Sequence, residues 1–222
     1  MKLVSVLTIM LLAISCASVK KDYGYMGDSS YKNKPVLKKS LIDPAKELSE
    51  KDIQRLLSSR VKINKKVNIA VTRLNSNNDF QRIDEEVAQR LYKRRNWGAK
   101  AQSIIPMPQL LIESPISLSN LRRSAVLLQA DLLVVIAPRS VVDWDFNFFE
   151  DNTAKATTSL EVILLDIRTG VVPFTSIITE TVELKKINND YSNEEMLERA
   201  RIESEKKALF QVSGQVAGFL KM

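Results

Sequence analysis

The sequence predicts an α/β fold in which helices pack on a mixed β-sheet, with the elements in the order βαβα-βββ-α. Three observations support this prediction. In the first half of the chain, helical stripes with apolar residues three and four positions apart alternate with short β-rich runs. In the second half, apolar residues recur at every second position, which is typical of strands with one buried face. A final helical stripe predicts a C-terminal helix that covers the sheet.

The amino-terminal residues read "MKLVSVLTIMLLAIS" and end at Cys16, the only cysteine of the chain. One lysine followed by an apolar run is the layout of an export signal, and the run is shorter than the roughly 20 apolar residues of a membrane span. The segment "LAISC" at 12–16 resembles the bacterial lipoprotein signal, in which the cysteine becomes the first mature residue and carries acyl chains. We predict a signal peptide at 1–15 and lipidation at Cys16, with a plain secretory signal or an uncleaved anchor as the alternatives.

Ala17 follows the cysteine. Where the familiar sorting rule holds, a residue other than aspartate at this place directs a lipoprotein to the outer membrane, so we expect its periplasmic face. Residues 16–48 then form the lipidated cysteine and a flexible, basic tether, because Gly, Ser, Asn and Lys outnumber residues that could pack. Residues 49–222 remain as a single periplasmic domain, a length that one core can support.

Composition limits the partners and the chemistry. The net charge is +7, but an exported protein seldom meets nucleic acid, so we expect the basic residues near the anchor to favour anionic membrane surfaces. The chain has no histidine, no Gly-rich phosphate loop and no cluster with metal-ligand spacing. We therefore expect no cofactor, no metal and no enzymatic activity.

The domain begins with a short helix. Ser49 and Asp52 have the spacing of a capping box in an acidic variant, and they predict a helix from about 50 to 59. The β-rich run "VNIAVTRL" at 67–74 is the first strand of the domain. An amphipathic helix that closes near Gly98 follows, with a stripe formed by Phe80, Ile83, Val87 and Leu91.

A second strand and a second helix come next. "AKAQSIIP" at 99–106 has strand character, and "PMPQ" after it is a breaker. The second helix is predicted through Leu121, Ala125 and Leu128 to Asp131. The apolar run "LLVVIAP" directly after it is a buried strand.

The period of two appears in an amphipathic hairpin from 142 to 164. Ala154, Ala156 and Leu160 share one face of its second arm, and "FEDNT" between the arms is turn-like. The apolar positions of the first arm are Val142, Trp144, Phe146 and Phe148.

Two elements complete the predicted fold. Gly170 suits a tight connection that needs positive φ, and a strand from Val171 to about Leu184 follows, with Pro173 indicating an edge or a bulge near its start. Ser192 and Glu195 have capping-box spacing at the start of the last helix. The apolar stripe of this helix is Leu209, Val212, Val216 and Phe219.

Two runs carry a family resemblance, "SNLRRSAVLLQADLLVVIAPRSVVDWDF" and "LEVILLDIRTGVVPFTSIITETVEL". They resemble the periplasmic α/β domain shared by the curli-secretion lipoprotein (CsgG-like) and the lipoprotein activators of penicillin-binding proteins (LpoB-like). In that family a helix ends in an Ala-Asp pair that leads into a buried strand, as Ala130 and Asp131 do here. A later strand ends in an aspartate before a Thr-Gly turn, as with Asp166, Thr169 and Gly170. The resemblance covers about 67–184 and implies a scaffolding role.

We accordingly expect a non-enzymatic, lipid-anchored accessory or adaptor protein of an envelope machine for cell-wall synthesis or secretion. Large aromatic side chains anchor protein interfaces, and the hairpin is where they gather. The same rings could instead pack under the helices, and Phe149 breaks the alternation. The predicted partner-binding residues are Trp144, Phe146, Phe148, Phe149, Glu150 and Asp151.

Two further functions are compatible with the sequence. A homo-oligomeric, curli-type secretion channel would use the hairpin at 142–164 once per subunit in a large ring. A cell-wall hydrolase would use paired acids, either Asp143 with Asp145 or Glu150 with Asp151. Acids that alternate with aromatics on a strand are more often its wet face, so we rank the hydrolase last.

The first testable prediction concerns Cys16. Because acylation is its evident chemistry, Cys16→Ser should either release the mature protein from the membrane fraction or leave the precursor unprocessed. Fractionation of cells followed by mass spectrometry of the amino terminus measures both outcomes. A Cys16→Ser protein that stays in the membrane and is cleaved at the same site would show that the lipoprotein interpretation is wrong.

Overall fold

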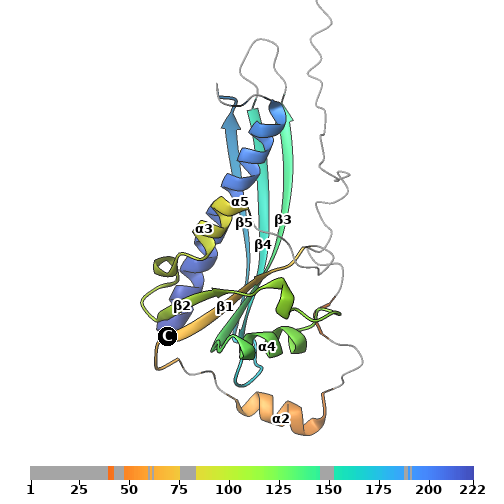
Figure 1. Ribbon diagram of the computed structural model, residues 1–222, viewed down its shortest axis with the longest axis vertical. Helices are drawn as coiled ribbons and strands as arrows, with labels where there is room; N and C mark the ends of the chain where they lie inside the picture. Colours follow the sequence, from red (N-terminus) through yellow and green to blue (C-terminus); the bar gives the residue numbers. More distant parts are fainter. Residues whose placement is uncertain are drawn as a thin grey trace, which may run out of the picture.

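The computed structural model describes residues 40–42, 48–59, 61, 63–75, 84–145, 153–187, 190 and 192–222. Figure 1 shows one long β-sheet with helices on both faces. In chain order the elements are α2 (Glu50–Ser58), β1 (Val67–Arg73), α3 (Glu85–Leu91), β2 (Ala101–Pro106), α4 (Leu118–Leu127), β3 (Leu132–Asp145), β4 (Thr153–Asp166), β5 (Phe174–Lys185) and α5 (Asn193–Lys221), with short 3₁₀ turns η2 (Arg94–Trp97) and η3 (Gln109–Leu111) on either side of β2.

The five strands form one mixed sheet in the order β2-β1-β3-β4-β5. β1 runs parallel to both β2 and β3, whereas β4 is antiparallel to β3 and β5. This arrangement confirms the predicted βαβα-βββ-α order and the mixed sheet. It also confirms the expectation, raised by Pro173, that the last strand lies at an edge.

Each face of the sheet has its own core. On one face, α5 buries Leu209, Val212 and Val216 against strand residues such as Ile69 and Leu164. On the other face, α4 packs its buried side against the first part of β3, with Leu121, Ala125, Leu133 and Val135 among the contacts. The C-terminal helix therefore covers the sheet, as its apolar stripe predicts.

The helix starts follow the predicted caps. The Ser49 hydroxyl accepts a hydrogen bond from the Asp52 backbone N–H, and the Ser192 hydroxyl accepts one from that of Glu195, each at 3.2 Å. α4 has the same kind of cap at Ser117, which the sequence interpretation did not identify. Such caps pair backbone donors that have no partner within the helix.

Three predicted boundaries are corrected. The second helix ends at Leu127 instead of Asp131, because Gln129 takes a left-handed φ of 54° and turns the chain toward β3. The last strand begins at Phe174, directly after Pro173, which lacks the N–H that a strand pairing needs. α3 (Glu85–Leu91) ends before the predicted end near Gly98, because Lys93 is extended and a separate 3₁₀ turn, η2, follows it. The predicted stripe residues Phe80 and Ile83 lie outside the described residues.

The buried run "LLVVIAP" and the first strand of the predicted hairpin form one continuous strand. β3 spans 14 residues, and it pairs with β4 along its whole length from Leu132 to Asp145. β1 pairs only with residues 132–136 of β3. The rest of the hairpin therefore extends past the parallel part of the sheet, as the long strands in Figure 1 show.

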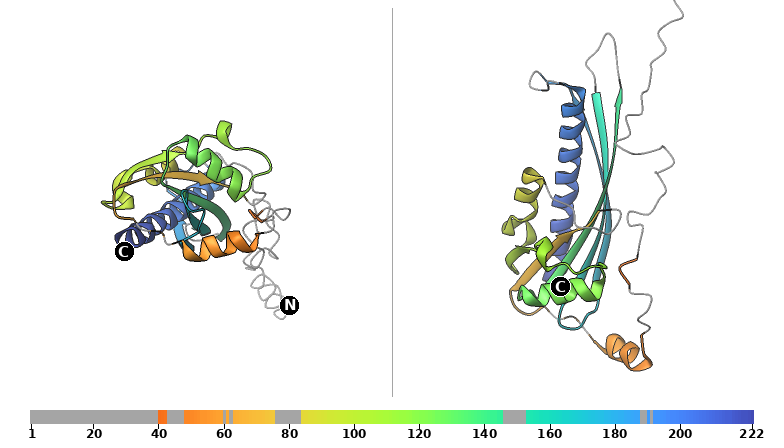
Figure 2. Two further views of the ribbon diagram at one scale, coloured as in Figure 1. Left: turned by 90° about the horizontal axis from the view of Figure 1, so that it is seen from below. Right: turned by 45° about the vertical axis from the view of Figure 1, so that its right-hand side comes forward.

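We call this extension the arm and define it by residues 137–145, 153–161 and 177–185, which are paired across the sheet. The remainder of the sheet, with α3 and α4, is the body. α5 begins beside the far end of the arm and runs along the strands to the body, as the right view of Figure 2 shows. Within the described ranges, no helix is long and apolar enough to span a membrane.

Truncation of α5 tests this architecture. A chain that starts at Ser49 and stops before Leu209 lacks the buried side chains of Leu209, Val212, Val216 and Leu220, so the core face of the sheet is left open to water. We expect this chain to lose its cooperative unfolding transition and its near-ultraviolet circular dichroism. The chain from Ser49 to Met222 is the control and should unfold cooperatively. A truncated chain with a sharp transition would contradict the described packing.

Candidate partner-binding arm and end pocket

Small side chains let α5 approach one face of the arm closely. Ala154 and Ala156 of β4 are fully buried against Met196 and Ala200 of α5. A small sheet of three strands needs a covered apolar face to be stable in water, and α5 supplies that cover for the arm. The apolar alternation predicted for the second strand of the hairpin, β4, is thus confirmed, and its apolar residues are part of the core.

A chain of hydroxyl groups joins the arm to α5. Ser140 and Thr158 lie opposite each other in the register, with their hydroxyl oxygens 2.8 Å apart. The Thr158 hydroxyl is 2.6 Å from that of Ser204, which donates to the Arg201 carbonyl oxygen at 2.9 Å. Each buried hydroxyl in this chain therefore has a partner, which removes the cost of burying it.

The opposite face of the arm is polar and uncovered by any described element. Hydroxyl pairs bridge β4 and β5 there: Thr157 with Thr181 at 3.0 Å and Ser159 with Thr179 at 2.9 Å. Beside them, the Ile177 side chain is 74% exposed. This surface of paired hydroxyl groups and the exposed Ile177 side chain can contact another protein without any rearrangement of the fold.

Most of the predicted partner-binding residues lie outside the described residues. These are Phe146, Phe148, Phe149, Glu150 and Asp151, which come between β3 and β4 in the sequence. Their role stays a prediction. For Trp144, the structure describes only a backbone paired with that of Ala154.

The paired acids proposed for hydrolysis are likewise only partly described. Asp143 is exposed and lies opposite Lys155 in the register, on the polar side of the strand. Asp145 lies opposite Thr153, and its side chain is not described. In the part of the chain that the structure describes, no group of His, Cys, Asp or Glu side chains could hold a metal ion.

A buried ion pair fastens α5 to the end of β1. A guanidinium nitrogen of Arg73 lies 2.6 Å from a carboxylate oxygen of Glu205, and the two side chains are 2% and 0% exposed. Arg201 contacts the same carboxylate at 3.1 Å and also reaches Asp84 at 2.7 Å, just before α3. One network therefore connects α5, β1 and the start of α3.

Burial and charge act against each other in this network. Burial raises the pKa of the Glu205 carboxyl, and the guanidinium groups of Arg73 and Arg201 oppose that change. Burial lowers the pKa of Arg73, and the Glu205 carboxylate opposes it. The hydrogen bond to Glu198 is the largest of several effects that raise the pKa of Arg201. Each charge is thus tolerable only while its partners stay in place.

Sequence reasoning missed this network, although one signal was present. Glu205 lies four residues before Leu209 and so falls on the apolar stripe of the last helix. A charged residue on a stripe that faces a sheet needs an opposite charge in the core. Nothing in the sequence alone indicates that this partner is Arg73.

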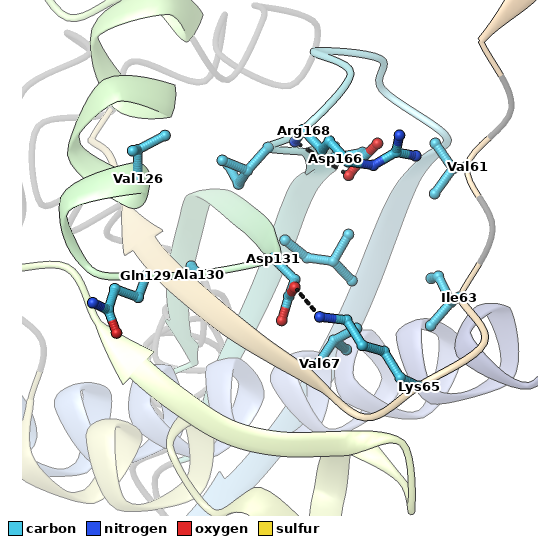
Figure 3. A pocket seen from close by; sticks show the side chains of 12 residues that line it. Val61, Ile63, Lys65, Val67, Val126, Gln129, Ala130, Asp131, Asp166 and Arg168 are labelled. Atoms are coloured by element: carbon cyan, nitrogen blue, oxygen red, sulfur yellow. Dashed lines mark hydrogen bonds and ion pairs between the residues drawn. The ribbon is translucent and has the colours of Figure 1, made fainter.

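A pocket of about 410 Å³ lies at the end of the body opposite the arm. It is bounded by the starts of β1 and β3, the end of α4, the turn after β4, and the segment that precedes β1 (Figure 3). We call it the end pocket. Its apolar walls include Val61, Ile63, Val67, Val126 and Ile167.

The charged groups of the end pocket include the aspartates on which the family resemblance rests. Asp131 accepts a hydrogen bond from the Asn68 backbone N–H at 2.9 Å, and it pairs with the Lys65 ammonium at 3.3 Å. Asp166 accepts from the Thr169 hydroxyl at 2.5 Å and from two backbone N–H groups of the same turn. Asp131 therefore joins the starts of β1 and β3, whereas Asp166 fixes the turn that follows β4.

The end pocket also has a cation, Arg168, that forms no ion pair with the described residues. The Arg168 side chain is exposed and lines the pocket, and no described residue forms an ion pair with it. The exposed Lys65 lies on the facing wall, where it is already paired with Asp131 (Figure 3). The pocket can accordingly receive an apolar group that carries an acid beside it.

Comparison with known proteins assigns no family to the chain. Neither the scan of protein-family models nor the search of curated proteins gives a match. Similar solved structures include a minor lipoprotein from Acinetobacter baumannii, with 6% identity and a TM-score of 0.39 over 68% of this chain and 91% of that chain.

Two other similar structures have comparable scores. A hypothetical protein from Chlamydia trachomatis has 14% identity and a TM-score of 0.38, over 70% of this chain and 98% of that chain. The PelC dodecamer from Paraburkholderia phytofirmans has 12% identity and a TM-score of 0.37, over 70% of this chain and 90% of that chain. Their descriptions name neither curli secretion nor activation of penicillin-binding proteins, and that resemblance stays a prediction.

Removal of the buried carboxylate is the third testable prediction. Glu205→Ala takes the counter-charge from Arg73 and should lower the free energy of unfolding by about 3–5 kcal/mol. The double variant Arg73→Met/Glu205→Leu should recover most of that loss, because it removes both buried charges. The exposed Glu183→Ala on β5 is the control and should change it by less than about 0.5 kcal/mol.

Urea denaturation of the domain from Ser49 onward measures these differences. If Glu205→Ala were as stable as Glu183→Ala, the ion pair would not hold α5 in place.

Proposed function

We propose that this protein is a non-enzymatic, lipid-anchored accessory protein of the bacterial cell envelope, and that the arm is the part that contacts an envelope partner. The observation that carries the proposal is the arm itself. Residues 137–145 of β3, with their partners in β4 and β5, extend past the body and are stiffened by α5 on one face only.

The two faces of the arm divide its tasks. The face under α5 buries alanines and paired hydroxyls and is committed to the fold. The other face presents hydroxyl pairs and the exposed Ile177, which the fold does not need. Exposed apolar groups on an otherwise polar surface are typical of interaction sites. The predicted aromatic residues at 146–149 would extend this surface beyond the described strands.

The anchor supplies the location. Cys16 with Ala17 favours the periplasmic face of the outer membrane, and the basic tether at 16–48 gives the domain reach from the lipid surface. The absence of histidine from the whole sequence, together with the exposed position of Asp143, favours binding over hydrolysis. A protein partner of the cell-wall or secretion machinery fits this placement best.

A subunit of a ring-shaped secretion channel is the second candidate. The observation that favours it is that the arm has two edge strands, β5 and residues 137–145 of β3, and that neither edge pairs with a further strand among the described residues. Edge strands can pair with another chain, and head-to-tail pairing of unlike edges closes into a ring. The hydroxyl-rich outer face does not provide the apolar band that lipid-facing strands need.

Substitutions on the arm test the proposed function. Ile177→Asp should reduce the cross-linked envelope partner several-fold without lowering the melting temperature, because Ile177 is exposed and contributes little to the core. Phe149→Ala, Glu150→Lys and Asp151→Lys should act in the same way. Cross-linking in cells, followed by purification of the adducts and mass spectrometry, measures the partner yield.

The control for this experiment is Leu110→Asp, which is 98% exposed in η3 on the body. Leu110→Asp should leave the partner yield unchanged. If the arm variants bind the partner as well as the unaltered protein does, the arm is not the binding site. A ladder of adducts that contains this chain alone would instead favour the ring.

A further inference from the structure

Helix α2 is an amphipathic helix that makes no extensive contact with the other described helices and strands. None of its nine residues is buried, and Leu57 is 76% exposed. Its apolar side chains are Ile53, Leu56 and Leu57, which the helical spacing places on one face. A helix this short is marginal in isolation, so it needs a surface on which its apolar face can pack.

The end pocket offers such a surface at the same end of the molecule. The view from below in Figure 2 shows α2 and α4 at this end, on either side of the chain that leads into the sheet. Val126 near the end of α4 is part of the apolar wall of the pocket and is 55% exposed. A pocket of about 410 Å³ has room for a few aliphatic side chains.

The chain does not place α2 over its own pocket. Ser59 is extended, with φ of −75° and ψ of 126°, and the pocket wall begins at Val61, only two positions later. Three residues reach about 10 Å at most, while a helix of nine residues is about 13 Å long. α2 is therefore kept beside the pocket that its own chain forms (Figure 1).

The charges favour a protein partner over a lipid surface. The polar side of α2 carries Glu50 and Asp52 together with Lys51 and Arg55, so its net charge is zero. Helices that lie on anionic membranes have Lys and Arg on the polar side instead. Glu50 in the first turn is a suitable partner for Arg168, whose guanidinium has no ion pair in the described part of the chain.

We propose that the apolar face of α2 from one copy of this chain inserts into the end pocket of a second copy, and that the exchange is reciprocal. Because the helix and the pocket lie at one end of the same molecule, a single two-fold axis satisfies both contacts at once. Glu50 of each copy then meets Arg168 of the other. The result is a dimer joined at the body, with both arms left free.

Cysteine cross-linking in the intact envelope tests the contact directly. Two copies of the full chain are produced together with different tags, one carrying Leu57→Cys and the other Val126→Cys. Cys16 is the only native cysteine, so the introduced thiols dominate the result. After mild oxidation we expect a band of dimer mass that contains both tags. The matched control replaces Val126→Cys with Ile177→Cys on the arm, and it should give no such band.

A charge reversal tests the register of the dimer. Arg168→Glu should weaken self-association of the purified full chain in detergent about fivefold, and adding Glu50→Arg should restore it, because the pair is then reversed. Sedimentation velocity measures the dissociation constant, and Leu57→Asp should leave only monomer.

Two results would overturn the proposal. The first is a monomer that gives no two-tag band. The second is loss of binding to vesicles of phosphatidylglycerol and phosphatidylethanolamine in Leu57→Asp without any change in self-association, which would assign α2 to the lipid surface. Neither result bears on the arm, so the proposed accessory function can be judged separately.

Discussion

The packing of α5 along one face of the sheet is the constraint on which the rest of the structure depends. This helix closes the core of the body, covers the arm, and carries the buried Glu205 that must meet Arg73. A buried carboxylate without its counter-charge costs several kcal/mol, so a shift of α5 along the sheet is strongly disfavoured. The ion pair therefore fixes the position of α5 along the sheet, while the apolar stripe of α5 supplies most of the stabilisation.

The arm is a consequence of that packing. Three strands that extend past the body have exposed edges and little core of their own, and by themselves they would be poorly stable. Here α5 continues from the body along the three strands, and alanines at 154 and 156 let it lie close. Because only one face is used in this way, the other stays free for a partner. The architecture thus separates an arm with one free, polar face from a body whose far end holds the end pocket.

The candidate sites differ in how far they could be predicted. The lipidation site at Cys16 is predicted, and the hairpin is predictable, because each follows a local pattern, an apolar run before a cysteine and a period of two. The end pocket is not predictable in this way, although two of its residues, Asp131 and Asp166, carry the family resemblance. Its walls come from Val61, Val126 and Ile167, which are more than 40 positions apart and share no spacing. Their approach depends on strand order, which periodicity does not encode.

The sequence by itself determined the order of the elements, the caps at Ser49 and Ser192, and the buried face of β4. These features depend on residues at most a few positions apart, so hydrogen bonding and periodicity within one segment decide them. Only the tertiary structure decided that β3 continues from the body into the arm, that Glu205 meets Arg73, and that α2 lies beside a pocket with none of its residues buried. Those outcomes depend on which distant segments come together, and that is settled by packing over the whole domain.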